Sequence, residues 1–410
     1  MKKINLHTFV LPNGLRVLHI PHKGDVAYCG MYVGVGTRDE LLSEHGYAHL
    51  TEHMLFKGTE KRSAAQIINR LEAVGGELNA YTTKEETVVY AVSLKRDLAR
   101  AFELVADVTL HTCITDANLL KEREVVMDEI DAYLDTPSES IIDDFEDAVF
   151  DGYTIGRNIL GTKQSLQAVT AQALDTFYKR MYTPSRQLFF VMGNVSAKQV
   201  EKWANSYLTL PAVASEASFS RLQPAQYTPS TQAKEKKTSQ AHCLIGGRAP
   251  SMFDADRHAF SLLINVLGGP STNSRLNMSL RERHALVYQV EAQYTPYSDT
   301  GIWSVYLGCD HFDLPKAINL VKNELVKLAE VTLTEASLRR AKRQLLAQQL
   351  IASDNKESWV LNAAKTYFLH GRLADYAQIE QKINASTAQQ LMQVAAQYFD
   401  PNNLSQLVFK

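Results

Sequence analysis

Residues 181–191 read MYTPSRQLFFV, and residues 398–408, YFDPNNLSQLV, repeat this stretch in outline. Each copy reads as the end of a helix, a turn built on an X-Pro pair, and a short apolar strand. The copies lie about 217 residues apart, which is close to half of the 410-residue chain. The sequence therefore predicts one structural unit that occurs twice, as in a diverged tandem duplication.

A second pair of segments supports the same offset. Ile114–Leu119 and Leu333–Leu338 each open a long helical stretch with a threonine in the capping position. The region between the halves is rich in Ala, Ser, Thr, Gln and charged residues and has little apolar periodicity. We therefore expect an N-terminal domain at residues 1–215, a linker at 216–238 and a C-terminal domain at 239–410.

Strand-like and helix-like stretches mix within both halves. Apolar alternation predicts strands such as Val26–Val35 and Gly301–Gly308, and helical periodicity predicts long helices at Ala117–Leu134 and Glu335–Ser353. The order shows no strict β-α-β alternation. We therefore expect an α+β fold of two homologous domains, each a mixed, mainly antiparallel sheet packed with helices.

The composition excludes several classes of protein. The 43 basic and 45 acidic residues give a net charge of −2, whereas a general nucleic-acid binder carries a basic excess. No apolar run approaches the roughly 18 residues of a membrane-spanning helix, and the N-terminal lysines are not followed by the apolar core of a secretory signal. The cysteines are scattered without a C-x-x-C pair, as expected for reduced thiols. They are Cys29, Cys113, Cys243 and Cys309. We therefore expect a cytoplasmic protein with no nucleic-acid or membrane partner.

The segment Gly46–Phe56, GYAHLTEHMLF, contains the spacing H-x-x-E-H. Its apolar residues fit a helix that no proline interrupts, so His49 and His53 should project from one face about one turn apart. At that spacing both imidazoles can bind a single Zn²⁺. Glu52 should lie beside them, where it can reach a catalytic water without ligating the metal. The order of these residues is the inverse of H-E-x-x-H and is a metallopeptidase signature.

A catalytic zinc site needs a third protein ligand and an open position. The helix expected around residues 121–130 offers four acids, Glu122, Glu124, Asp128 and Glu129. Glu122 and Glu129 are seven residues apart and share one face, but a solvated helix with charge pairs explains the same pattern. Helix geometry does not choose among the four acids.

The whole chain resembles the inverted-motif zinc metallopeptidases, the family of pitrilysin, insulin-degrading enzyme and mitochondrial processing peptidase. It is most similar to their short bacterial, processing-peptidase-like branch. The matching segments are LPNGLRV at 11–17, GYAHLTEH at 46–53, FKGT at 56–59, GGELNA at 75–80, Glu122-Arg123 with Glu129, and Gly161-Thr162. The resemblance implies one Zn²⁺ per chain, held by His49, His53 and Glu129, which follows His53 by 76 residues. It also implies that Glu52 is the general base and that Glu122 orients a ligand or the water.

The second half carries no zinc motif. At an offset of 219 residues, Glu129 corresponds to Gln348 and Glu122 to Ala341, and neither is a zinc carboxylate. The resemblance instead implies that Arg281 and Tyr288 form the family's arginine–tyrosine pair. This pair would hold the substrate and stabilise its oxyanion.

Two departures from the family pattern stand in this chain. Ala285 occupies a position where we expect a glycine, just before Tyr288. Tyr153-Thr154 occupies the place where relatives often carry His-Pro.

Three residues of the stretch Leu78–Val92 resemble the edge strand that pairs with the substrate backbone in this family. They are Asn79, Ala80 and Thr82, and the pairing would be β-augmentation. As an ordinary amphipathic strand, the same stretch needs no binding role.

These features predict a zinc-dependent endopeptidase that acts on peptides or unfolded segments. Members of the family enclose the site between four such domains, so two domains per chain predict a homodimer with active sites completed across subunits. The alternatives are the catalytic subunit of a heteromeric processing peptidase and a non-catalytic structural subunit.

Overall fold

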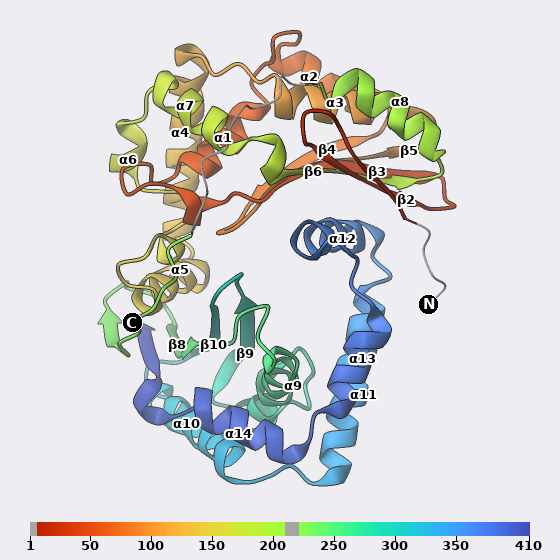
Figure 1. Cartoon of the computed structure of the whole chain (residues 1–410). Coiled ribbons are helices and arrows are strands. Elements are labelled where there is room, and N and C mark those ends of the chain that lie inside the picture. The colour runs from red at the N-terminus through yellow and green to blue at the C-terminus, as the bar shows by residue number, and fades with distance from the viewer. Residues whose placement is uncertain (1–5, 210–220) are drawn as a thin grey trace. The chain divides into compact units, whose positions relative to one another are not determined.

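The structure is a computed structural model that describes residues 6–209 and 221–410 (Figure 1). Its internal contacts divide the chain into two compact units. Unit 1 comprises Met1–Ile130, Arg157–Arg221 and Asn355–Ala374, and unit 2 comprises Asp131–Gly156, Leu222–Asp354 and Asp375–Lys410. The units therefore differ from the predicted halves, because each includes one segment from the other half of the sequence.

Unit 1 contains a six-stranded sheet with the order β1-β2-β6-β3-β5-β4. β2 and β6 pair in parallel, and the other neighbours pair antiparallel. β4 and β5 form a hairpin that includes the whole stretch Leu78–Val92. The strands are β1 (His7–Val10), β2 (Arg16–Pro21), β3 (Val26–Val33), β4 (Glu77–Thr82), β5 (Thr87–Leu94) and β6 (Gln187–Gly193).

Helices cover both faces of this sheet. α3 packs against β3 and β5, whereas α12 packs against β3 and β6 from the opposite face (Figure 1). The helices are α1 (Tyr47–Leu55), α2 (Ala64–Glu72), α3 (Leu98–Leu110), α4 (Asp116–Leu134), α6 (Lys163–Gln167), α7 (Ala171–Met181), α8 (Ala197–Tyr207) and α12 (Lys356–His370). α12 comes from the second half of the sequence.

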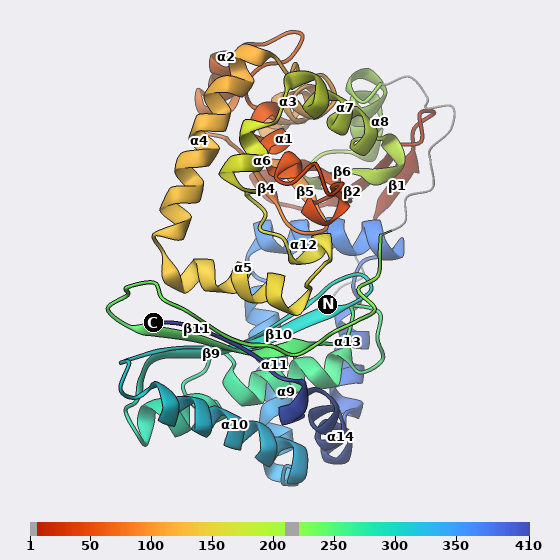
Figure 2. The same cartoon turned by 90° about the vertical axis from the view of Figure 1, so that its left-hand side faces the viewer.

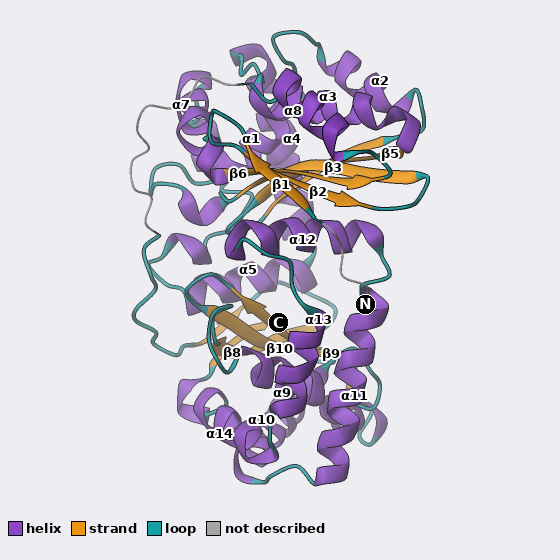
Figure 3. Cartoon of the chain, turned by 45° about the vertical axis from the view of Figure 1, so that its right-hand side comes forward, coloured by secondary structure: helices purple, strands orange, loops and turns teal. Residues whose placement is uncertain are grey.

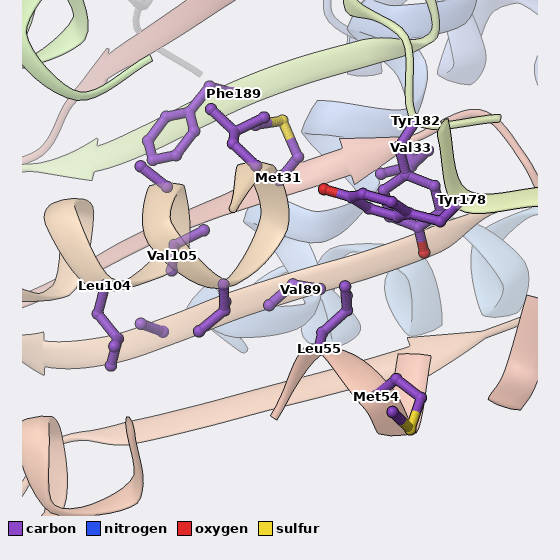
Figure 4. Packing of buried hydrophobic residues seen from close by; sticks show 14 of the residues in the cluster. Met31, Val33, Met54, Leu55, Val89, Leu104, Val105, Tyr178, Tyr182 and Phe189 are labelled. Atoms are coloured by element: carbon purple, nitrogen blue, oxygen red, sulfur yellow. The ribbon is translucent and has the colours of Figure 1, made fainter. Parts of the chain in front are cut away.

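The strand β6 explains the apolar run in the segment 181–191. Phe189 and Val191 belong to the core beneath α1 and α3, and Leu188 and Phe190 belong to the cluster formed with α12. Successive side chains of a strand point to opposite faces, so a strand buried on both faces is apolar throughout. Figure 4 shows the first of these cores, where Phe189, Met31 and the α1 residues Met54 and Leu55 are drawn.

Unit 2 repeats this topology. Its five-stranded sheet has the order β7-β11-β8-β10-β9, and β7 and β11 pair in parallel. The order matches β2-β6-β3-β5-β4 of unit 1, strand for strand. The strands are β7 (Thr231–Lys234), β8 (Ala241–Arg248), β9 (Val287–Pro296), β10 (Gly301–Cys309) and β11 (Ser405–Phe409).

β7 lies inside the segment predicted as the linker, residues 216–238. Its sequence TQAK is polar and exposed, so it carries no apolar alternation that would predict a strand. Main-chain pairing with β11 places it in the sheet. Residues 216–220 of the predicted linker lie outside the described residues.

Helices also cover both faces of the second sheet. α5 packs against β8 and β11 (Figure 2), and α9 packs against β9 on the opposite face. The helices are α5 (Pro137–Val149), α9 (Arg257–Gly268), α10 (Leu314–Glu330), α11 (Glu335–Ala352), α13 (Tyr376–Ala385) and α14 (Ala388–Tyr398). A π-helical turn, η5, spans Asn277–Glu282. Figure 3 shows the strands of each unit as one layer between helices.

β11 is buried on both faces, as β6 is. Leu407 and Phe409 lie in the cluster formed with α5, and Val408 lies in the core shared with α9 and α14. α5 comes from the first half of the sequence, so each sheet is covered on one face by a helix from the other half. The predicted fold class, two homologous α+β domains with mixed, mainly antiparallel sheets, is confirmed.

Two further predictions concern single features of the chain. None of the four cysteines forms a disulfide. Among the described residues, no helix has both the length and the apolar character needed to cross a membrane.

Candidate metal centre

Helix α1 carries the two predicted histidine ligands. It begins after Gly46, whose φ of 91° lies in the left-handed region that glycine adopts without strain. The buried Glu40 carboxylate accepts hydrogen bonds from the backbone N–H groups of Gly46 (3.1 Å) and Ala48 (2.8 Å). These bonds satisfy two donors at the start of the helix that have no partner within it. Burial raises the pKa of Glu40 to about 8, although the two amides lower it.

The two histidines converge with Glu129 of α4. The distance from His49 Nε2 to Glu129 Oε2 is 3.9 Å, and that from His53 Nε2 to the same oxygen is 3.6 Å. Candidate ligand atoms of the three residues all lie within 4.8 Å of one another. Across residues 6–209 and 221–410, no other group of three or more His, Cys, Asp or Glu side chains converges in this way.

The donor set fits Zn²⁺. Two imidazole nitrogens and one carboxylate oxygen are zinc ligands, and three protein ligands leave a position open for chemistry. Burial, and then the neighbouring His53, lowers the pKa of His49 to about 3. His49 is therefore a neutral imidazole, the form that binds a metal. Its Nδ1 is buried and has no hydrogen-bond partner among the described residues.

Glu122 contacts His53 from behind the cluster. Its Oε2 lies 3.2 Å from His53 Nδ1, and its Oε1 accepts a hydrogen bond from Lys57 Nζ at 2.7 Å. A proton on Nδ1 that is donated to this carboxylate leaves Nε2 free to face Glu129 and His49. The other two acids of α4, Glu124 and Asp128, are exposed and are not members of the cluster.

Glu52 lies on α1 between the two histidines and meets β4. The Thr82 hydroxyl donates a hydrogen bond of 2.5 Å to Glu52 Oε2. Burial raises the pKa of Glu52, and the bond from Thr82 opposes this shift. The carboxylate is therefore held in one position beside the metal cluster.

β4 is the last strand of the first sheet. Asn79 on this strand is exposed, and Ala80 is half-buried against the core. Thr82 stands at the end of β4 and bonds to Glu52 rather than pointing freely to solvent. The structure thus brings Thr82 to the candidate metal cluster, and Asn79 lies on a strand that pairs on one side only within the described part of the chain.

Arg281 and Tyr288 belong to unit 2. Arg281 is exposed in the last turn of η5, and Tyr288 is exposed on β9. The Tyr288 hydroxyl donates a hydrogen bond to Asp310 Oδ1 at 3.1 Å, and this bond raises the pKa of Tyr288. Ala285, between them, has a φ of 48°. This left-handed conformation gives the physical reason why a glycine is expected at that position.

Three contacts of the candidate metal centre are not among those predicted from the sequence. They are the cap that Glu40 provides for α1, the bond from Thr82 to Glu52, and the ion pair of Lys57 with Glu122. Glu40 precedes Gly46, the N-cap residue of α1, by six residues and could have been predicted as an acid placed before a helix start. The other two contacts join residues of separate elements, and the spacing of residues along the sequence does not predict them.

Comparison with known proteins places this geometry in a family. The model "Insulinase (Peptidase family M16)" matches residues 16–163, and the model "Peptidase M16 inactive domain" matches residues 168–345. A protein of Mycobacterium leprae named an uncharacterized zinc protease is 34% identical over 396 residues, covering 94% of this chain and 88% of that protein. The chain belongs to peptidase family M16.

Two further proteins are similar over nearly the whole chain. The uncharacterized zinc protease YmxG of Bacillus subtilis is 29% identical, with 95% of each chain covered. The crystal structure of a protease from Helicobacter pylori matches with a TM-score of 0.90 at 21% identity, covering 99% of both chains. At that identity the match supports the fold. The metal cluster lies in the part that matches the first family model, and Arg281 and Tyr288 lie in the part that matches the second.

Proposed function

We propose that this protein is a zinc-dependent endopeptidase that hydrolyses peptides or unfolded segments. The observation that carries the proposal is the convergence of His49, His53 and Glu129, with Glu52 fixed beside them. A bound Zn²⁺ would supply Lewis acidity for the scissile carbonyl and would acidify the attacking water. His49, His53 and Glu129 would hold it.

Glu52 is the proton carrier in this proposal. Its carboxylate takes a proton from the attacking water and hands it to the leaving amine, which is general acid–base catalysis. The Thr82 hydroxyl holds one carboxylate oxygen, so the reacting group does not have to be ordered during each turnover. Glu122 keeps the His53 ring in the orientation and tautomer that present Nε2.

In this proposal, the substrate binds by main-chain pairing with β4 and through two side chains of unit 2. An extended peptide would add to the free edge of β4 at Asn79 and Ala80, because the polar main-chain groups of an edge strand have no partner on that side. Arg281 and Tyr288 would hold the substrate backbone and its developing oxyanion.

The test is peptide hydrolysis by the purified chain, with and without a chelator. We expect one zinc per chain, loss of cleavage on chelation, and recovery when zinc is added back. Glu52→Gln should lower kcat by about 10²–10⁴-fold while zinc content stays at one per chain. Glu72→Gln, an exposed glutamate at the end of α2, serves as the control and should leave cleavage unchanged.

Two outcomes would favour the alternatives. A chain that holds no zinc after gentle purification and cleaves no peptide would be a structural subunit. A chain that binds zinc but cleaves only after a second family member is added would be half of a heteromeric processing peptidase.

The proposed assembly is a homodimer in which the metal centre of one subunit works with Arg281 and Tyr288 of the other. Mixing the inactive variants Glu52→Gln and Arg281→Ala tests this arrangement. Sites completed across subunits would regain one working site per mixed dimer. Mixed dimers that form without regaining activity would contradict it.

A further inference from the structure

Unit 2 contains a cavity of about 380 Å³ between α9, the chain that leads into η5, and the first turns of α11. α9 and α11 are in contact, and Figure 1 shows both helices in the lower part of the view. The volume falls within the range of small-molecule sites. Its charged lining residues are two arginines, Arg275 and Arg340, and its lining includes no acid.

Arg275 lines the cavity, and its guanidinium N–H groups are available to donate hydrogen bonds. Its nearest carboxylate is that of Glu324, where Nη1 and Oε2 are 3.8 Å apart, beyond hydrogen-bond distance. The other oxygen of Glu324 already accepts a bond from Lys327 at 2.8 Å. Within the described part of the chain, the Arg275 guanidinium makes no hydrogen bond, although its side chain is only 29% exposed. A guanidinium carries five donors, and removing them from water without an acceptor is unfavourable.

Arg340 approaches from α11. Its only hydrogen bond within the described residues is a long one, 3.3 Å from Nη2 to Ser337 Oγ. The cavity also lies at the first turn of α11, an 18-residue helix whose N-terminus adds partial positive charge. A bond of 3.2 Å from Gln344 Nε2 to Asn273 Oδ1 ties the loop to the helix. The guanidinium groups of Arg275 and Arg340 therefore border one cavity, and the Gln344–Asn273 bond joins the two sides of its wall.

The rest of the lining mixes polar and apolar side chains, and its polar members are Asn265, Asn273, Ser274, Ser337 and Gln344. Val266, Met278 and Leu333 contribute side chains to the wall, together with Ala341. Ala341 corresponds to Glu122 of the first half, so a methyl group stands where the metal centre has a carboxylate. The small side chain leaves space between the helices.

We propose that this cavity binds a small organic molecule that carries a phosphate group. Arg275 and Arg340 bind the phosphate oxygens, because guanidinium forks match the geometry of phosphate. The polar and apolar side chains of the remaining lining contact the organic part, and these contacts are missing when inorganic phosphate binds alone. The site is separate from the proposed peptidase reaction and does not depend on it.

Calorimetric titration of the full-length, zinc-loaded chain tests the site. Glucose 6-phosphate serves as the phosphorylated probe, and inorganic phosphate and glucose serve as its two fragments, at constant ionic strength. We expect one glucose 6-phosphate per chain, weaker binding of inorganic phosphate, and none of glucose. Arg340→Gln and Arg275→Gln should each weaken binding at least tenfold. Arg339→Gln removes the same charge from the neighbouring exposed position, which does not line the cavity, and should bind as the wild type does.

Three results would overturn the proposal. One is the absence of saturable binding of glucose 6-phosphate. Another is an equal loss in Arg339→Gln and Arg340→Gln, which would reveal a general attraction of anions. The third is loss of binding in His53→Ala, which would place the phosphate at the metal centre. Arg340 is exposed, so its variant keeps the test valid even if Arg275→Gln fails to fold.

Discussion

The helix pair α1–α4 of unit 1 and the helix pair α9–α11 of unit 2 occupy the same place in two copies of one topology. The first pair brings His49, His53 and Glu129 together in a group that could hold a metal ion. In the second pair, the position of Glu129 is held by Gln348, whose Oε1 accepts a 2.7 Å hydrogen bond from Asn265 Nδ2 of α9. A hydrogen bond between neutral side-chain amides thus connects the helices where the first copy has the candidate metal site.

The difference shows that the scaffold and its chemistry are separable. Both copies need a helix pair beside the sheet to bury the apolar faces of their strands, so the packing is retained. The residues that face each other across the pair are free to change, because a hydrogen-bonded pair of amides satisfies its own polar groups as well as a metal does. In unit 2 this change leaves a cavity bordered by arginines in place of a cluster with carboxylates.

The largest effect on zinc binding is expected from exchanging Glu129 of α4 and Gln348 of α11, the corresponding residues of the two helix pairs. Glu129→Gln removes a ligand, so zinc affinity should fall by more than the roughly 10–100-fold that loss of an outer partner costs. Gln348→Glu should leave zinc at one per chain, because α9 presents Asn265 and not a histidine to that position. Metal analysis after dialysis measures both. Full zinc content in Glu129→Gln, or a second zinc in Gln348→Glu, would break the comparison.

A smaller effect on zinc affinity is expected from Glu122, which contacts the proposed ligand His53. Glu122→Gln keeps the shape of the side chain but weakens the acceptor for His53 Nδ1 and removes the charge that pairs with Lys57. Zinc affinity should fall by about 10–100-fold. Competition with a chromogenic chelator measures it, and Glu124→Gln, an exposed acid two residues along the same helix, is the matched control. Equal affinities in the two variants would remove Glu122 from the site.

Thr82→Val tests how the edge strand and the proton carrier are joined. A hydrogen bond to a charged group contributes about 1.5 kcal/mol or more, so kcat should fall about tenfold. If Thr82 acts through Glu52, KM stays within about twofold, and Thr82→Ser restores kcat. A raised KM with unchanged kcat would return Thr82 to the substrate-binding role that the sequence suggested.

The smallest effect concerns matching turns before β4 and β9. The turn before β4 has Gly75 at a φ of 74°, whereas the turn before β9 has Ala285 at 48°. Ala285→Gly should raise the free energy of unfolding by about 0.5–1 kcal/mol, because it relieves the left-handed strain of alanine. Ala347→Gly, at an exposed position inside α11, should lower it by about 1 kcal/mol. Urea unfolding measures both, and destabilisation by Ala285→Gly would contradict the argument.

Much of the fold could be predicted from local sequence. The helices α1, α4 and α11 and the strands β3 and β10 lie where the spacing of apolar residues along the sequence predicts them. β7 could not be predicted, because its residues are polar and only pairing with β11 makes them a strand. The spacing of His49 and His53 likewise follows from the helix alone, whereas the choice among the four acids of α4 needed the family resemblance.

The consecutive apolar residues in β6 and β11 already indicate strands buried on both faces, because they leave no polar face for water. The spacing of His49 and His53 likewise places both histidines on one face of a helix. The helices that cover these strands are seen only in the folded chain. α12, from the second half of the sequence, covers β6, and α5, from the first, covers β11. The hydrophobic effect is not directional, so an apolar strand face requires an apolar partner but does not specify which one. The exchange of helices between the two halves therefore results from long-range packing and cannot be predicted from a local pattern.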